Sequence, residues 1–223
     1  MRRTLFRDRA EAGRQLATRL NAYANRRDVI VLALPRGGVP VGFEVALALH
    51  AALDVFGVRK LGVPGQEELA MGAVATGGAV LLNPEVVHYL GISEAELQSV
   101  IDAEREELER RNRLYRDDRP PPEVKSKAVI LVDDGLATGA SMRAACAALR
   151  QLGPARLVVA VPVAPVEACE EMRAEADEVV CAATPEPFYG VGMWYADFTQ
   201  TTDAQVRNLL ARADAAKVAG ETK

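Results

Sequence analysis

One stretch decides the fold of this chain: Val129-Ile130-Leu131-Val132-Asp133-Asp134-Gly135-Leu136-Ala137-Thr138-Gly139-Ala140-Ser141. Its four leading apolar residues predict a buried strand, which ends at two adjacent carboxylates. A turn with two glycines follows, and we expect a helix from about Ala140. Backbone amides in such a turn and at a helix start bind phosphate esters, and the hydroxyls of Thr138 and Ser141 add donors. The stretch therefore predicts a phosphate site at the end of a central strand.

The acidic pair indicates what accompanies the phosphate. Asp133 and Asp134 would repel the phosphate itself, so they fit neutral hydroxyls or a cation a few ångströms away. A Walker A loop would need a lysine that is absent here. A dinucleotide fingerprint would need G-x-G-x-x-G where the chain has Pro35-Arg36-Gly37-Gly38-Val39-Pro40. A phosphorylated sugar with two adjacent hydroxyls is the ligand that this pattern favours.

Outside this stretch, apolar runs alternate with amphipathic segments. The predicted strands are 29–34, 54–61, 128–132, 157–163 and 179–182, and the predicted helices are 39–53, 140–152 and 167–176. Gly77-Gly78 predicts a β-hairpin over 72–82. The alternation indicates an α/β fold, with a mostly parallel twisted sheet flanked by helices on both faces. Ligands bind at the carboxyl ends of such strands, which here means after Leu34, Lys60 and Val132.

The segment 93–118 carries a long additional helix. Ser93 and Glu96 form a capping box at its start, and the helix should continue to about Tyr115. Its apolar residues form one narrow stripe, Leu97, Ile101, Leu108 and Tyr115, with Glu and Arg around it. A narrow stripe buries little area, so two interpretations stay open: part of the helix projects from the body or contacts a partner subunit, or it is a solvated surface helix.

Composition restricts the class of protein. The 223 residues are 49% hydrophobic and carry a net charge of −4, which favours one domain over 1–223 and disfavours nonspecific nucleic-acid binding. The longest apolar run, 157–166, is interrupted by two prolines and is far shorter than the ~20 residues that cross a bilayer. No apolar segment follows Met1-Arg2-Arg3, so we predict a cytoplasmic protein.

The cysteines predict neither disulfides nor zinc. Cys146, Cys169 and Cys181 are odd in number and contain no C-x-x-C pair. His50 and His88 lie far from each other and from any cysteine at metal-binding spacing. Without a secretory signal, three small buried thiols are the expected state.

The opening stretch resembles the phosphoribosyl pyrophosphate (PRPP) signature of the type I phosphoribosyltransferases: an apolar strand, two acidic residues and a loop that ends in T-G-x-[ST]. All thirteen positions match. The resemblance covers the core, about 28–183, and the whole chain is similar to stand-alone bacterial members. It implies transfer of the 5-phosphoribosyl group of PRPP to a nitrogenous, nucleobase-like acceptor, with release of pyrophosphate and with Mg²⁺ carried by PRPP.

The resemblance assigns roles residue by residue. It places the ribose hydroxyls on Asp133 and Asp134, which with Lys60 and Arg36 form the expected catalytic set. It places the 5′-phosphate on Gly135, Ala137, Thr138, Gly139, Ala140 and Ser141, and the pyrophosphate on Arg36 and Gly37. No side chain is assigned as a metal ligand.

Lys60 is expected to precede a flexible catalytic loop over 62–72. Glu67 and Glu68 in this loop do not suit a polyanionic substrate, so its function stays open. The chain ends, 1–25 and 184–216, are candidates for the hood that binds the acceptor. Phe188, Tyr189 and Trp194 could stack on an acceptor ring, or could seal the sheet edge.

A second hypothesis stays open beside the transferase: a non-catalytic sensor or regulator that binds PRPP or a nucleotide on the same fold. Hydrolysis or phosphorolysis of a ribose phosphate is a third. The expected partners are PRPP and an unidentified acceptor, with no membrane and no nucleic acid. The long helix offers a surface for a homodimer.

Overall fold

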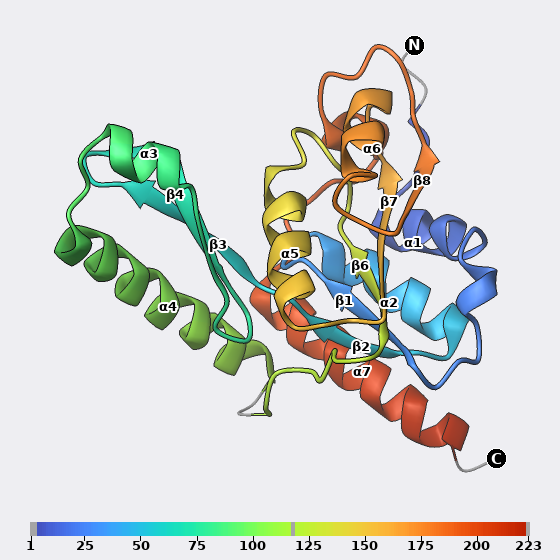
Figure 1. The fold of residues 1–223 in the computed structure, drawn as a ribbon. Helices are drawn as coiled ribbons and strands as arrows, with labels where there is room; N and C mark the ends of the chain where they lie inside the picture. Colours follow the sequence, from blue (N-terminus) through green and yellow to red (C-terminus); the bar gives the residue numbers. More distant parts are fainter. Residues whose placement is uncertain (1–3, 117–118, 222–223) are drawn as a thin grey trace.

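A five-stranded parallel sheet forms the centre of the molecule (Figure 1). The structure is a computed structural model that describes residues 4–116 and 119–221. The strand order is β2-β1-β6-β7-β8, and every neighbouring pair is parallel. The strands are β1 (Val29–Ala33), β2 (Ala52–Val55), β6 (Ala128–Val132), β7 (Arg156–Val163) and β8 (Glu178–Ala183). The predicted α/β class and parallel sheet are confirmed.

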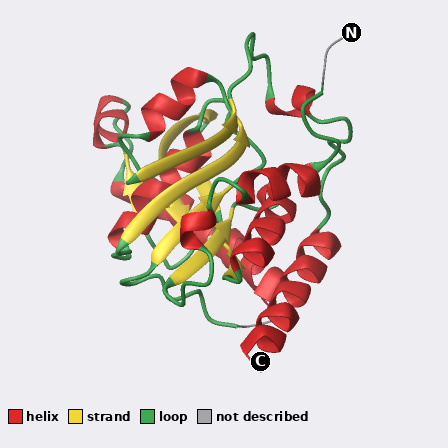
Figure 2. Ribbon diagram, turned by 90° about the vertical axis from the view of Figure 1, so that its right-hand side faces the viewer, coloured by secondary structure: helices red, strands yellow, loops and turns green. Residues whose placement is uncertain are grey.

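Helices cover both faces of this sheet (Figure 2). One face carries α1 (Arg9–Ala17), α2 (Gly38–Leu49) and α7 (Asp203–Glu221), and the other carries α5 (Ala140–Gln151) and α6 (Val166–Met172). In β1, Val31 and Ala33 join the first core, and Ile30 and Leu32 join the second. Alternate side chains of a strand point to opposite faces, so a strand between two helix layers is apolar at every position. In the described parts of the chain, none of the helices has the length and apolar character needed to cross a membrane.

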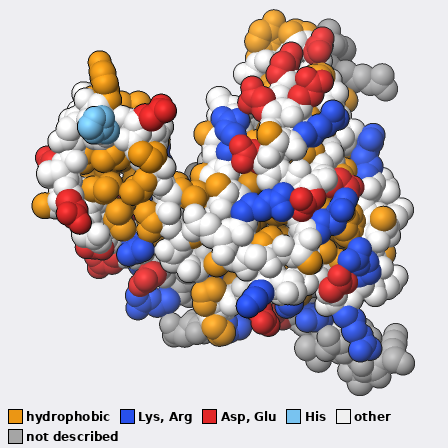
Figure 3. Space-filling view, viewed as in Figure 1, with side chains coloured by type: hydrophobic (Ala, Val, Ile, Leu, Met, Phe, Trp, Pro, Cys, Tyr) orange, Lys and Arg blue, Asp and Glu red, His pale blue; other side chains and the backbone are white. Residues whose placement is uncertain are grey.

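A second unit, residues 58–116, projects from this body, and we call it the arm (Figure 3). It contains the antiparallel sheet β3-β4-β5 and two helices. Its elements are β3 (Val58–Val63), β4 (Gln66–Ala75), β5 (Val80–Leu82), α3 (Pro84–Tyr89) and α4 (Glu94–Arg116). Leu61, Met71, Val74 and Ile101 belong to its own apolar core. The arm starts two residues after β2, at the sheet edge where ligands are expected.

Two predictions about this region are wrong. The expected strand 54–61 is two strands, because the chain leaves the parallel sheet at Gly57, whose N–H donates to Thr76 Oγ1 (2.9 Å). The expected flexible loop 62–72 is a paired hairpin of β3 and β4 around a turn at Pro64-Gly65. Gly65 has φ +75°, which suits that turn. The apolar residues Leu61, Val63 and Met71 pack inside the arm and hold the hairpin together.

The long helix α4 packs against the rest of the chain along its apolar stripe. Its capping box forms as predicted, with Ser93 Oγ donating to Glu96 Oε2 (2.6 Å). Ile101 and Leu108 pack on the arm sheet, and Tyr115 joins the core of the body. The stripe is therefore buried within this chain, while most of the remaining surface of the helix is exposed. The helix lies at the surface and projects from the body as part of the arm, as two of the interpretations from the sequence have it (Figure 1). Contact with a partner subunit stays a prediction. The predicted end of this segment, 117–118, lies outside the described residues.

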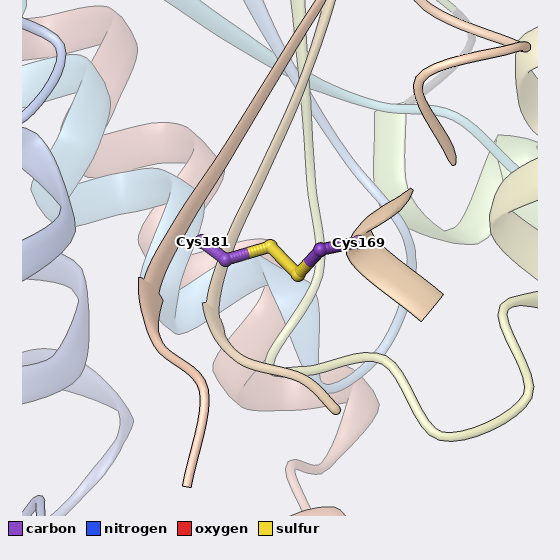
Figure 4. The surroundings of a disulfide bond; sticks show 2 residues. All are labelled: Cys169 and Cys181. Carbon is purple, nitrogen blue, oxygen red and sulfur yellow. A yellow bond between two sulfur atoms is a disulfide. The ribbon is translucent and has the colours of Figure 1, made fainter. Parts of the chain in front are cut away.

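The cysteine prediction is wrong for two of the three thiols. Cys169 in α6 and Cys181 in β8 form a disulfide, with Cα atoms 6.8 Å apart (Figure 4). α6 connects the parallel neighbours β7 and β8, and this crossover brings the two residues together. The number and spacing of the cysteines do not indicate such a contact. Cys146 is buried in α5 as a free thiol, as expected.

Candidate functional site

The acidic pair and the Arg36-Gly37 loop meet at the carboxyl ends of adjacent strands. β1 and β6 are parallel neighbours in which Ala33 is opposite Val132, so the loops after them emerge side by side. A Cβ atom placed on Gly37 would lie 2.1 Å from Asp134 Oδ2. Only glycine fits between this loop and the carboxylate. The Pro35–Arg36 peptide bond in the same loop is cis.

The predicted phosphate turn leads directly into α5. Gly139 has φ +71° and precedes Ala140, the first residue of the helix. Ala137, Thr138, Ala140 and Ser141 are exposed, and the Ala140 N–H donates to the Thr138 hydroxyl (3.5 Å) at the start of the helix. Gly135 is buried: a Cβ there would lie 2.6 Å from a Val191 methyl carbon. The turn is thus packed at its base and open at its tip, where a phosphate group can approach the helix N-terminus.

The two carboxyl groups are electrostatically coupled. Asp133 Oδ1 accepts a hydrogen bond from the backbone N–H of Asp134 (2.8 Å). Burial, and then the negative charge of Asp134, raise the pKa of Asp133 well above its ordinary value. Burial also raises the pKa of Asp134, while its hydrogen bond from Arg9 acts in the opposite direction. Two such groups are suited to hydrogen-bonding neutral hydroxyls or the water around a bound cation.

Two residues of this site were not found from the sequence. Arg9 Nε donates to Asp134 Oδ2 (2.8 Å), and the Tyr195 hydroxyl donates to the backbone carbonyl of Asp134 (2.6 Å). They come from α1 and from the segment after the 3-10 helix Val191–Trp194. Neither lies in a motif, and no local pattern links either of them to Asp134.

Arg36 and Lys60 occupy different surroundings. Arg36 Nη1 lies 3.8 Å from Asp203 Oδ1 of α7, and about a third of its side chain is exposed. Lys60 belongs to β3 of the arm, where its Nζ donates to the Glu68 carbonyl (3.1 Å). The structure therefore brings the backbone of the Arg36-Gly37 loop against Asp134 at Gly37. In the described part of the chain, no hydrogen bond or ion pair joins the Arg36 or Lys60 side chain to the acidic pair.

The aromatic residues expected around the acceptor lie next to the phosphate turn. Phe188 and Trp194 stack with ring centroids 6.3 Å apart, and Val191 between them touches Gly135. Tyr189 is 71% exposed. Trp194 Nε1 is buried and has no hydrogen-bond partner among the residues that the structure describes. Phe188 and Trp194 also pack against a small core around Phe6 and Tyr195, so these rings seal the sheet edge as well as bordering the site.

Comparisons with known proteins agree with this geometry. A family model described as "Phosphoribosyl transferase domain" matches residues 5–192. Two Mycobacterium tuberculosis proteins, named "Putative phosphoribosyl transferase Rv0571c" and "Putative phosphoribosyl transferase MT0597", are 47% identical over 209 residues, which are 94% of this chain and 47% of each relative. The chain spans about half the length of these curated relatives.

One solved structure is similar over nearly the whole chain. The crystal structure of TT1426 from Thermus thermophilus is 45% identical in sequence, with a TM-score of 0.81. The match covers 93% of this chain and 98% of that one. The family model includes the Arg36-Gly37 loop, the acidic pair and the phosphate turn. Taken with the site geometry, these matches show that the chain belongs to the phosphoribosyl transferase domain family.

Proposed function

We propose that this protein transfers the 5-phosphoribosyl group of PRPP to a nitrogen atom of a nucleobase-like acceptor and releases pyrophosphate. One observation carries the proposal. The Arg36-Gly37 loop lies directly against Asp134, beside the open turn at the start of α5. This arrangement offers separate groups for a phosphate monoester, two hydroxyls and a diphosphate, which are the three parts of PRPP.

Each part of PRPP is assigned to its own group. The amides of residues 137–141, with the exposed hydroxyls of Thr138 and Ser141, hold the 5′-phosphate at the N-terminus of α5. Asp133 and Asp134 accept hydrogen bonds from the ribose hydroxyls. The backbone of the Gly37 loop and the Arg36 guanidinium hold the diphosphate. Lys60 reaches the diphosphate only if its contact with Glu68 is broken.

The reaction needs no protein nucleophile. The acceptor nitrogen forms a bond to C1 of the ribose, and the bond from C1 to the diphosphate oxygen breaks with its electron pair leaving on pyrophosphate. The proton of the acceptor N–H is released to water, so the products are the ribonucleotide, pyrophosphate and a proton. The chain contributes by holding the reacting groups in line and by stabilising the charge on the departing diphosphate. Mg²⁺ bound with PRPP would neutralise part of that charge. The carboxylate oxygens of the acidic pair fit a hard cation whose remaining ligands are substrate oxygens and water.

The acceptor is proposed to be an aromatic heterocycle. The stacked rings of Phe188 and Trp194 lie beside the phosphate turn, and the exposed Tyr189 ring follows Phe188 in the same segment. Flat rings of this kind contact a flat acceptor through offset stacking.

Pyrophosphate release from PRPP in the presence of Mg²⁺ tests the proposal. The assay compares purine, pyrimidine and pyridine acceptors with a control without acceptor, and the Asp133→Asn, Asp134→Asn double variant runs beside the wild type. Release that requires one acceptor and is lost in the double variant supports the transferase. Release without any acceptor indicates hydrolysis instead. Binding of PRPP without release indicates a sensor, and the absence of both refutes the proposal.

A further inference from the structure

Arg9 is the charged residue outside the signature that lies deepest in the site. It is the first residue of α1, and its Nε donates to Asp134 Oδ2 at 2.8 Å. The side chains are 11% and 15% exposed, respectively. Surface ion pairs contribute little because water screens them, whereas a pair this buried couples its partners strongly.

The guanidinium of Arg9 is held on two further sides. Its Nη1 donates to the carbonyl of Thr199 (2.7 Å), and its central carbon lies 3.9 Å from the centroid of the Phe198 ring. That distance places the cation over the ring face, where the ring attracts it. Arg9 is therefore a preorganised group, with both its plane and its direction determined before any ligand binds.

The segment 195–199 also contacts the backbone of Asp134. The Tyr195 ring lies 5.0 Å from the Phe198 ring, and its hydroxyl donates to the Asp134 carbonyl (2.6 Å). One end of the chain thus holds the Asp134 carboxylate through Arg9, and the other holds the backbone through Tyr195. The Gly37 backbone closes a further side of the same carboxylate.

These contacts leave one carboxylate oxygen of Asp134 for a ligand. Oδ2 accepts from Arg9 and faces Gly37, while no other residue of the described chain donates a hydrogen bond to Oδ1. Asp133 lies next in the chain, and two neighbouring carboxylates repel each other unless a cation compensates them. Arg9 supplies that compensation from the protein side, opposite to the ligand.

We propose that Arg9 is a positioning residue for PRPP, which acts through Asp134 by holding its carboxylate in the one orientation that presents Oδ1 to a ribose hydroxyl. The inference rests on the proposed function of the site. The Arg9 side chain is largely buried, and two of its N–H groups donate to Asp134 and Thr199, so we assign it to orienting the carboxylate and not to binding the sugar.

Calorimetric titration with three probes tests this role. The probes are PRPP, ribose 5-phosphate and pyrophosphate, each with Mg²⁺. In Arg9→Gln, we expect affinity for PRPP and ribose 5-phosphate to fall about 10- to 100-fold, the effect that loss of an orienting partner has at other sites. Pyrophosphate, which carries no ribose, should bind as in the wild type. Arg9→Lys should recover part of the loss because it restores the charge without the planar fork.

Two further variants separate positioning from folding. Arg14→Gln, on the same helix and half-exposed in its ion pair with Glu44, should bind all three probes like the wild type. Phe198→Leu removes the ring beneath the guanidinium and keeps the ion pair, so it should give the same pattern as Arg9→Gln with a smaller loss. Thermal unfolding of each variant shows whether it is folded at the titration temperature.

A double-mutant cycle with Asp134→Asn decides the mechanism. If Arg9 acts through Asp134, then Arg9→Gln causes no further loss of PRPP affinity in the Asp134→Asn background. The same loss in both backgrounds, or equal weakening of all three probes in Arg9→Gln, would overturn the inference. A wild-type protein that binds neither PRPP nor ribose 5-phosphate would overturn the proposed function itself. Wild-type binding with unchanged Arg9→Gln affinity would overturn the positioning role alone.

Discussion

Replacement of Gly37 by alanine should weaken PRPP binding roughly 100-fold without unfolding the protein. An alanine Cβ would lie 2.1 Å from Asp134 Oδ2, whereas real Cβ contacts essentially never fall below 3.0 Å, so one of the two must move by about 0.9 Å. Asp134 is held by Arg9 at 2.8 Å and cannot retreat without breaking that hydrogen bond. A misplacement of about 1 Å costs roughly 100-fold, or about 2.7 kcal/mol, in a site that depends on positioning.

The assay is calorimetric titration of Gly37→Ala with PRPP and Mg²⁺, compared with Gly153→Ala. Gly153 lies after the far end of α5, with φ +69° and open space around its Cβ position. Alanine there should cost about 1 kcal/mol of folding stability and leave PRPP affinity unchanged. This control separates lost stability from a displaced carboxylate. PRPP affinity in Gly37→Ala within threefold of the wild type, a margin of about 0.6 kcal/mol, would refute the reasoning.

Three further predictions concern charge and burial. The pKa of Asp133 is raised in the folded state, so the native protein keeps a proton that the unfolded chain loses near pH 3.8. The free energy of unfolding should therefore fall as the pH rises from about 3.8 through the raised pKa of the folded state. Asp133→Asn should reduce this slope in urea unfolding, leaving the part due to Asp134, be more stable than wild type at neutral pH, and lose PRPP binding. Arg116→Met leaves Asp54 without its buried partner at 2.8 Å and should lower the free energy of unfolding by about 3 kcal/mol, while Arg113→Met on the exposed side of the same helix should change it little. Burial raises the pKa of the Cys146 thiol to about 12, so a thiol reagent at pH 8 should modify Cys146 only after denaturation; rapid labelling of the native protein would contradict this.

The parallel sheet and the chemical centre were predictable because their signals are local. A fully apolar strand between two helix layers, such as Val29–Ala33, has a distinctive pattern whatever its neighbours are. The same holds for the signature, in which the strand, the acidic pair, the turn and the start of α5 follow one another along the chain. Because these elements follow one another along the chain, the sequence alone shows which of them lie together.

The arm was predictable only in part. Its capping box and its glycine turn were recognised from residue types, and both are present. The hairpin of β3 and β4 was missed because Gln66 to Ala70 are exposed and carry two glutamates, which is typical of a loop. The segment is a strand because it pairs with β3 and because Leu61 and Met71 belong to the apolar core of the arm. The residues of the segment alone do not show which strand it pairs with.

The sequence by itself determined the fold class and the order of strand, acidic pair, glycine turn and helix start, because each depends on residues close together along the chain. The need for glycine at position 37 depends on Asp134, which is distant in sequence, so the tertiary structure decides it. Only the tertiary structure decided which distant groups close on that centre. Arg9 is 125 residues from Asp134, and it arrives there because α1 packs beside α2 on one face of the sheet. The crossover through α6 likewise decides that Cys169 meets Cys181. Such pairings follow from how helices and strands pack in space, which no local pattern of residues specifies.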